Sequence, residues 1–205
     1  MLTDDNPLPD GIPEELRRQL EFVIEVDQMK SVIRQTSIAT GERRENDAEH
    51  SWHLTLMALV FASRAKEPVD LVRVLSMLVV HDLVEIYAGD TPLHIVDDQQ
   101  EARERDAADQ LFPLLPGAQG QQLREAWEEF EAHETPEARF ARSLDRMQPL
   151  LLEWMNRGVH WLEQGRTSSA ARERLKVIDD GSPDLWTAAL ALIEEAESRG
   201  YLLDE

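Results

Sequence analysis

The residues most able to do chemistry lie in one segment near the middle of the chain, His81-Asp82-Leu83-Val84-Glu85-Ile86-Tyr87-Ala88-Gly89-Asp90. This segment brings an imidazole and three carboxylates together directly after an apolar run at 77–80, where unpaired charge is costly to bury. A divalent cation would compensate that charge, because neutral imidazole and carboxylate are ligands for several divalent metals. For the His-Asp pair alone, the simpler interpretation is a helix end whose side chains are satisfied by hydrogen bonds.

Two further imidazoles, His50 and His53, lie about thirty residues upstream. Their spacing of three puts both on one face of a helix, and either can complete a site with the His-Asp pair. Taken alone, they are more simply core or surface histidines, and Asp145 beside Arg146 is more simply a surface acid. The order favours a metal site, because a ligand helix is followed by the His-Asp pair and then by a downstream aspartate.

The elements that must position these residues are predicted to be helices. Apolar residues recur at helical spacing along nearly the whole chain, and no segment alternates convincingly between apolar and polar residues. We therefore expect an all-α fold, with Asn46 or Asp47 capping the helix that carries His50. A short helix or turn followed by a loop is expected over 30–46, and the expected helices cover about 13–26, 47–66, 69–87, 97–112, 119–132, 136–163, 168–177 and 182–198.

Length and composition limit the class of protein. The 205 residues, 42% of them hydrophobic, indicate one domain over 13–205 preceded by an N-terminal arm over 1–12. A net charge of -20 argues against a partner surface for nucleic-acid polymers or anionic membranes, so an anionic substrate needs a metal or a few arginines. The chain has no cysteine, no secretory signal and no membrane-spanning apolar stretch, which favours the cytoplasm.

The order His50, His81-Asp82, Asp145 resembles the HD superfamily of metal-dependent phosphohydrolases, which is named for the His-Asp pair. Longer sequence words are similar to its branch that includes the bacterial 5'-deoxynucleotidases, and the resemblance covers roughly residues 15–200. These words are Glu-Asn-Asp-Ala-Glu-His-Ser-Trp-His, His-Asp-Leu-Val-Glu-Ile-Tyr-Ala-Gly-Asp-Thr, Glu-Thr-Pro-Glu-Ala-Arg-Phe-Ala and Leu-Asp-Arg-Met-Gln-Pro-Leu-Leu. The resemblance implies a compact multi-helix HD-domain fold with a metal site in its helical core.

The resemblance also implies a role for each residue of that order. His50, His81, Asp82 and Asp145 match the metal ligands of the family, and Glu85 matches its catalytic acidic residue, which orients or deprotonates the attacking water. The implied cofactor is one divalent ion, which this ligand set leaves open among manganese, cobalt, iron, nickel, zinc and magnesium.

Two more residues match positions that contact the substrate in the resembling enzymes. Arg34 matches a phosphate-binding arginine with a part in catalysis, and Asp90 matches a residue that faces the sugar of a deoxynucleotide. The chain departs from the pattern after that arginine, because Gln35 stands where the deoxynucleotidases have a tryptophan that crowds the 2' position of the sugar. Selectivity for deoxynucleotides over ribonucleotides is therefore not implied for this chain.

The function expected from these residues is hydrolysis of a small phosphate ester, most plausibly a nucleoside or deoxynucleoside 5'-monophosphate. A metal can neutralise a phosphoryl oxygen and lower the pKa of its bound water, while Glu85 takes a proton and Arg34 holds the phosphate. Alternatives are another HD activity, on a nucleoside triphosphate, a cyclic nucleotide or an alarmone, and an idle metal-binding or nucleotide-binding helical module. The motifs of zincin proteases and of ferritin-like di-iron proteins are absent from the sequence.

The remaining aromatic and histidine residues receive structural interpretations. The five tryptophans are interpreted as core or interface residues, and His94, His133 and His160 as surface histidines. So many tryptophans beside apolar helix positions, together with the tendency of the resembling enzymes to dimerise, predict a homodimer.

Overall fold

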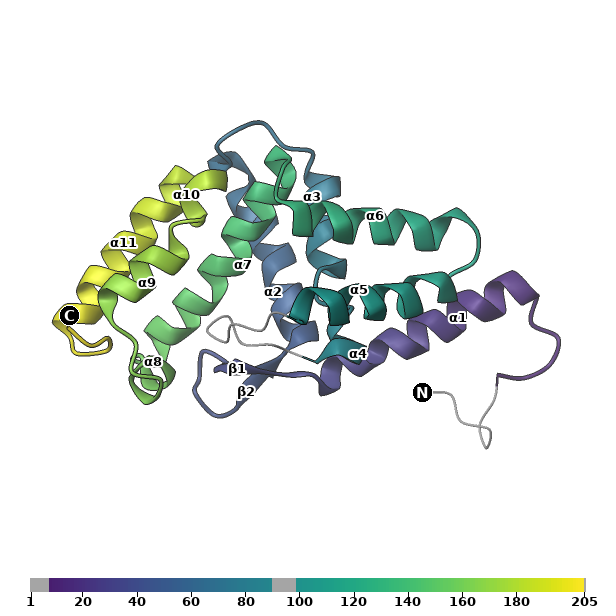
Figure 1. Cartoon of the computed structure of the whole chain (residues 1–205), viewed down its shortest axis with the longest axis horizontal. Helices are drawn as coiled ribbons and strands as arrows, with labels where there is room; N and C mark the ends of the chain where they lie inside the picture. The colour runs from purple at the N-terminus through teal and green to yellow at the C-terminus, as the bar shows by residue number, and fades with distance from the viewer. Residues whose placement is uncertain (1–7, 90–98, 205) are drawn as a thin grey trace.

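The computed structural model describes residues 8–89 and 99–204 of the chain. Most of this part is helical, which confirms the all-α prediction (Figure 1). The α-helices are α1 (Glu14–Val26), α2 (Asp47–Phe61), α3 (Leu71–Val80), α4 (Glu85–Ala88), α5 (Gln100–Leu111), α6 (Ala118–Ala132), α7 (Pro136–Met155), α8 (Val159–Glu163), α9 (Ser168–Leu175), α10 (Ile178–Gly181) and α11 (Pro183–Ser198). Short 3-10 helices η1 (Asp27–Ser31), η2 (Ala62–Arg64) and η3 (Phe112–Leu114) and strands β1 (Ile33–Ser37) and β2 (Arg44–Asn46) complete the described elements.

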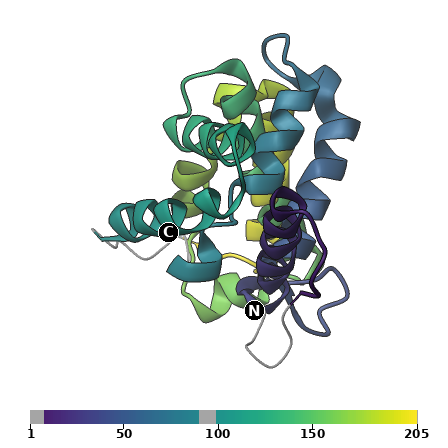
Figure 2. The ribbon, with the colours of Figure 1, turned by 90° about the vertical axis from the view of Figure 1, so that its right-hand side faces the viewer.

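Helix α7 runs through the middle of the molecule, between α9, α10 and α11 on one side and α5 and α6 on the other (Figure 1). Its buried Phe140 and Leu144 belong to a large apolar cluster with residues of α2, α3, α10 and α11. A second cluster, which includes Phe22, Leu111 and Trp127, holds α1, α5 and α6 to the end of α3. Helices α2 and α3 lie side by side (Figure 2), and both pack against α7. These three core helices surround the predicted site residues.

The start of α2 is fixed by a reciprocal cap. Asn46 Oδ1 accepts a hydrogen bond from the backbone N–H of Glu49, and the Glu49 carboxylate accepts one from the backbone N–H of Asn46. Such a capping box satisfies two amide donors that the first turn of a helix leaves free. The predicted cap is thus confirmed at Asn46, and it sets the helix phase that brings His50 into the core.

The segment between η1 and α2 contains an antiparallel hairpin, where a loop was expected after a short helix or turn. Strands β1 and β2 pair with Ile33 opposite Asn46 and Ser37 opposite Arg44. The prediction was wrong because strands of five and three residues are too short to show a clear alternation. The hairpin places Arg34, near the start of β1, within reach of the centre.

The helix predicted over 69–87 is interrupted at the His-Asp pair. Helix α3 ends at Val80, and the backbone then forms turns with hydrogen bonds between residues three apart, from Leu83 N–H to the Val80 carbonyl and from Glu85 N–H to the Asp82 carbonyl. Helix α4 begins only at Glu85. These tighter turns change the direction in which the side chains leave the backbone, so the single-helix prediction was wrong where the chemistry lies.

The helix predicted over 136–163 is also two helices. Helix α7 ends at Met155, and α8 begins at Val159 after a turn in which Arg157 and Gly158 have left-handed φ angles of 57° and 67°. A β-carbon on Gly158 would lie 2.1 Å from the Tyr201 carbonyl oxygen, so this position requires glycine. The break turns α8 back over one end of the cavity described below. No helix in 8–89 or 99–204 is long and apolar enough to cross a membrane.

Candidate metal centre

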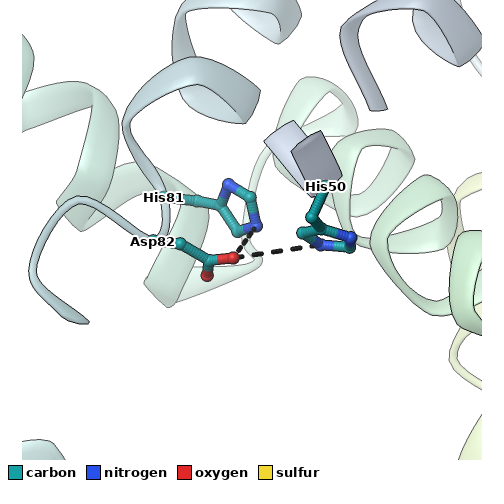
Figure 3. A group of neighbouring side chains, drawn as sticks. All are labelled: His50, His81 and Asp82. Atoms are coloured by element: carbon teal, nitrogen blue, oxygen red, sulfur yellow. Dashed lines mark ion pairs between the residues drawn. The ribbon is translucent and has the colours of Figure 1, made fainter. Parts of the chain in front are cut away.

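Three helices bring the predicted ligands together in the core. His50 comes from α2, His81 and Asp82 follow α3, and Asp145 comes from α7. His50, His81 and Asp145 are buried, and one ligand atom each from His50, His81 and Asp82 lie within 4.8 Å of one another. Figure 3 shows the carboxylate of Asp82 turned toward both imidazoles, with Oδ2 at 3.1 Å from His81 Nε2 and 3.9 Å from His50 Nε2.

Asp145 closes the group from the side of α7. Its Oδ1 lies 3.1 Å from His50 Nε2 and 3.9 Å from His81 Nε2. The predicted ligands therefore present two imidazole nitrogens and two carboxylates to one region of the core. Two neutral imidazoles and two carboxylates are a ligand set that divalent transition metals accept.

The orientation of His50 is set by a buried amide. The Nδ1 of His50 lies 3.0 Å from Gln148 Oε1, while Gln148 Nε2 donates to Glu45 Oε2 at 2.9 Å. This pattern assigns the Gln148 oxygen to the histidine, so Nδ1 carries the proton and the lone pair of Nε2 faces the carboxylates. Metal-binding histidines in general donate their second ring nitrogen in this way.

His81 has the same arrangement with a backbone partner. Its Nδ1 lies 3.0 Å from the Leu78 carbonyl oxygen, which can only accept, so Nδ1 is the donor. Its Nε2 is buried and has no hydrogen-bond partner among the described residues, although Asp82 Oδ2 is 3.1 Å away. A lone pair facing carboxylate oxygens needs a proton or a cation between them, so the residues present fit a divalent metal.

The charges around the two aspartates keep both ionised. Although burial favours the protonated acid, the protonated form that His81 takes while no cation is bound, together with Arg34, holds the pKa of Asp82 well below its usual range. Burial acts on Asp145 in the same way, and there the charge of Arg146, at 3.0 Å from Oδ2, lowers the pKa. The centre thus offers anionic ligands at neutral pH.

Arg34 reaches the centre from β1. Its Nη1 donates to Asp82 Oδ2 at 2.8 Å and to Asp47 Oδ1 at 3.0 Å. In spite of burial, these carboxylates raise the pKa of Arg34, which stays charged. Its Nη2 donates no hydrogen bond to any described residue, and Arg34 lines a cavity beside the centre. One end of the guanidinium is therefore anchored while the other is left for a ligand.

Glu85 lies next to a second group of carboxylates. Ligand oxygens of Asp47, Asp82 and Glu85 lie within 4.8 Å of one another, and Glu85 Oε2 is buried without a partner among the described residues. Burial and the charges of Asp82 and Asp47 raise the pKa of Glu85 well above its usual range. A cation bound beside Asp82 removes part of that repulsion and so favours the ionised form that a base requires.

A cavity of about 290 Å³ opens beside the centre. Asp82, Glu85 and Asp145 line it at the centre, and five arginines also line it, namely Arg34, Arg142, Arg146, Arg166 and Arg174. Glu104, Glu131 and Glu153 line it as well, so the arginines stand among as many carboxylates and offer an anionic substrate individual guanidinium partners rather than a uniformly positive surface. Gln35, the residue after Arg34, lines the same cavity.

Several residues of the site escape prediction from the sequence. Asp47 and Gln148 carry no recognisable signal, except that each lies three residues from a predicted ligand, His50 or Asp145, and so shares its helix face. The interpretation of His160 as a surface histidine was wrong, because it lines the cavity and its Nε2 lies 2.9 Å from Ser37 Oγ. Asp90, expected to face the sugar, lies outside the described residues.

Two other predicted surface or core residues also differ. His133 is half-buried and contacts Arg142, a cavity residue. Of the tryptophans, Trp127 is buried in the core, as expected, whereas Trp52 is 65% exposed on α2. The exposed Trp52 side chain is available to an interface with another chain.

Comparisons with known proteins agree with this geometry. The HD domain family profile matches residues 26–186. The 5'-deoxynucleotidases HDDC2 of Bos taurus and Homo sapiens are 31% and 30% identical over 138 residues, which make up 66% of this chain and 66% of each relative. The chain thus spans about two thirds of the length of the curated relatives it matches.

Solved structures share the whole architecture. The crystal structure of a predicted metal-dependent phosphohydrolase from Magnetospirillum magnetotacticum is 44% identical, with a TM-score of 0.88 over 98% of this chain and 99% of that chain. The HD domain-containing protein YGK1 is 15% identical with a TM-score of 0.60, covers 95% of this chain and 96% of its own, and shares the fold alone. The resemblance expected from the sequence is confirmed: the chain belongs to the HD domain family.

Proposed function

We propose that this protein hydrolyses nucleoside 5'-monophosphates to nucleoside and phosphate, using one divalent metal ion held by His50, His81, Asp82 and Asp145. The observation that carries the proposal is that two imidazole lone pairs and two ionised aspartates face one another in the core. This group lies at the end of a cavity that five arginines also line. The curated relatives named 5'-deoxynucleotidases support the choice of substrate class.

The residues around the ion have distinct tasks in this reaction. When bound, the ion supplies Lewis acidity and neutralises charge on the phosphoryl group. The free Nη2 edge of Arg34 donates to phosphoryl oxygens, while its Nη1 stays on Asp47 and Asp82. Glu85 accepts one proton of the attacking water at a carboxylate oxygen, so the water adds to phosphorus as hydroxide. The bond between phosphorus and the nucleoside 5'-oxygen breaks, and that oxygen takes up the proton to give the free nucleoside.

The metal is proposed to be a transition ion. Manganese, cobalt, iron, nickel and zinc all accept imidazole together with carboxylate, whereas magnesium favours oxygen ligands and keeps several waters. Two histidines among the four proposed ligands therefore place magnesium last among the candidates. Which transition ion is bound depends on availability in the cell as well as on the ligands.

The enzyme is proposed to discriminate little between ribose and deoxyribose. Gln35 lines the cavity next to Arg34, at the position where the resembling deoxynucleotidases carry a tryptophan. A flexible amide leaves room for a 2'-hydroxyl and can donate a hydrogen bond to it. We therefore expect ribonucleotides and deoxynucleotides to be turned over at similar rates, and Asp90 remains a predicted contact of the sugar.

A homodimer is proposed through the outer face of α2 and α3. This face exposes six large apolar side chains, Trp52, Leu56, Leu59, Val60, Val72 and Val79. A helix that is apolar on all sides needs a partner on its outer face as well as in the core, and two chains of net charge -20 repel unless they meet on an uncharged surface. Light scattering should give a dimer for the wild type and a monomer for Leu59→Asp, and a monomeric wild type at micromolar concentration would refute this assembly.

A panel of metals and substrates tests the proposed activity. Metal-free protein should be loaded in turn with manganese, cobalt, nickel, zinc and magnesium, and phosphate release measured from nucleoside monophosphates, triphosphates, cyclic nucleotides and alarmones. We expect the monophosphates to be the best substrates. Preference for any other class would replace the proposal by another HD activity, and no turnover by metal-loaded protein would favour a binding module.

A further inference from the structure

The cavity extends well beyond the metal centre along one face of α7. Asp145, Pro149 and Glu153 all line it, and their spacing of four residues places them on the same face of the helix. At 1.5 Å per residue, Glu153 lies roughly 12 Å along α7 from Asp145. The cavity therefore has a metal end and a far end, and the far end lies between α7, α8 and α9.

About half of the residues that line the far end are apolar. Leu150 of α7, Trp161 of α8 and Ala171 and Leu175 of α9 line the cavity there together with Pro149. Apolar walls with a few polar groups are typical of small-molecule pockets, and an aromatic wall favours a flat ring such as a nucleobase. A nucleotide with its phosphate at the metal end points its base in this direction.

Two polar groups at the far end, Glu153 and Arg166, are not paired with each other. Glu153 is only 6% exposed, and its carboxylate accepts from the backbone N–H groups of His160 and Trp161, while its Oε2 has no hydrogen-bond partner among the described residues. Arg166 Nε donates a hydrogen bond to Gln164 Oε1 at 3.2 Å, and no ion pair links Arg166 to Glu153 in the described part of the chain. Arg174 of α9 lines the same end. Burial lowers the pKa of the Arg166 guanidinium, and the nearby charge of Arg174 lowers it further.

We propose that the far end of the cavity is a base-reading subsite that selects guanine, with Glu153 accepting from the base and Arg166 donating to it. Guanine presents O6 and N7 as neighbouring acceptors, which a guanidinium binds in pairs. Its adjoining Watson–Crick edge carries N1–H and the 2-amino group, which a carboxylate binds. Adenine has an amino donor in place of O6 and no N1–H, so it mismatches both protein groups. This inference rests on the proposed nucleotidase function.

Steady-state kinetics on four substrates tests the subsite. The value of kcat/KM should be measured for dGMP, dAMP, dCMP and dTMP with the wild type, Glu153→Gln and Arg166→Gln. We expect the wild type to prefer dGMP, and each variant to lose about tenfold on dGMP, the effect of one charged hydrogen bond, with little change on dAMP. Matched controls are Glu173→Gln and Arg157→Gln, which alter exposed residues outside the cavity lining.

A second measurement separates the base from the phosphate chemistry. Deoxyguanosine, which has no phosphate, should bind to the wild type more tightly than deoxyadenosine in calorimetric titrations, and Arg166→Gln should reduce the difference about tenfold, with Glu153 supplying the rest. Because Arg166 is not a core residue, this variant carries the test even if Glu153→Gln fails to fold. Equal kcat/KM for all four bases, or a loss in the variants that is the same for every base, would overturn the subsite, whereas no phosphate release from any nucleotide would overturn the proposed function instead.

Discussion

The two ends of the cavity are built in different ways. At the metal end, each proposed ligand is held by a partner, as His50 is by Gln148, His81 by the Leu78 carbonyl and Asp82 by Arg34. At the far end, Glu153 and Arg166 share one cavity without pairing, and the wall comes from short helices that follow a break in the chain. Fixed charge favours chemistry, whereas unpaired donors and acceptors favour recognition. Substitutions at the metal end should therefore affect all substrates alike.

The largest effect is expected from loss of a ligand at the metal end. Asp82→Ala removes the carboxylate that faces both imidazoles, so the protein should lose its metal and at least about 10³-fold in kcat with every nucleotide. Metal content by mass spectrometry and phosphate release check this result. Asp106→Ala, at an exposed position on α5, is the control and should keep both. A metal-loaded, active Asp82→Ala protein would contradict the proposed ligand set.

The next effect concerns the proposed base. Glu85→Gln should retain the ion and the fold but lower kcat about 10²–10⁴-fold, because it removes a proton acceptor that acts in the transition state. The loss should be equal for dGMP and dAMP, which distinguishes it from the changes at the far end. Near-normal turnover by the metal-loaded variant would show that another group takes the proton.

A smaller effect is expected for Arg34, which serves both the substrate and the protein. Arg34→Ala should raise KM about tenfold or more and lower kcat to a lesser degree, since one charged hydrogen bond contributes about 1.5–3 kcal/mol. It also leaves Asp47 and Asp82 uncompensated, so the variant should unfold at a lower temperature in a chelator and recover with metal. Thermal unfolding with and without the ion checks this, and an unchanged metal-free protein would show that the ion pair is not needed.

The smallest effect at the metal end concerns the orientation of a ligand. Gln148→Leu removes the hydrogen bond to His50 Nδ1, so metal affinity should fall about 10–100-fold while saturating metal restores kcat. Titration of the metal-free protein with cobalt or manganese measures the affinity. Equal affinities of the wild type and Gln148→Leu would show that the amide does not orient the ligand.

The two ends also differ in how far the sequence predicts them. The metal end contains His50, the His-Asp pair and Asp145 in a recognisable order, so its residues could be named before their geometry was known. The turn at 81–84 could not be predicted, because its apolar spacing continues that of α3 and only the backbone hydrogen bonds reveal the change. The far end depends on the break at Gly158, whose requirement for glycine comes from Tyr201, more than forty residues later in the chain. Long-range contacts of this kind leave no local pattern.

The hairpin illustrates the same limit on a smaller scale. Arg34 could be matched to a phosphate-binding residue by its order in the chain, but its neighbours Asp47 and Asp82 follow from the pairing of β1 with β2 and from the end of α3. The residues that hold the ligands in place, Gln148 and Glu45, act through side-chain contacts across about one hundred positions. Motifs therefore identified the reactive groups, while the groups that orient them required the fold.

The position of the ion is the most direct test of the central claim. A crystal of the cobalt-loaded or manganese-loaded protein should give one anomalous peak per chain, with His50 Nε2, His81 Nε2, Asp82 and Asp145 bound to it at about 2.0–2.3 Å. The account predicts that Arg34 and Glu85 lie beside this ion without binding it. A single peak among Asp47, Asp82 and Glu85, with the histidines unbound, would contradict the proposed centre and the roles assigned around it.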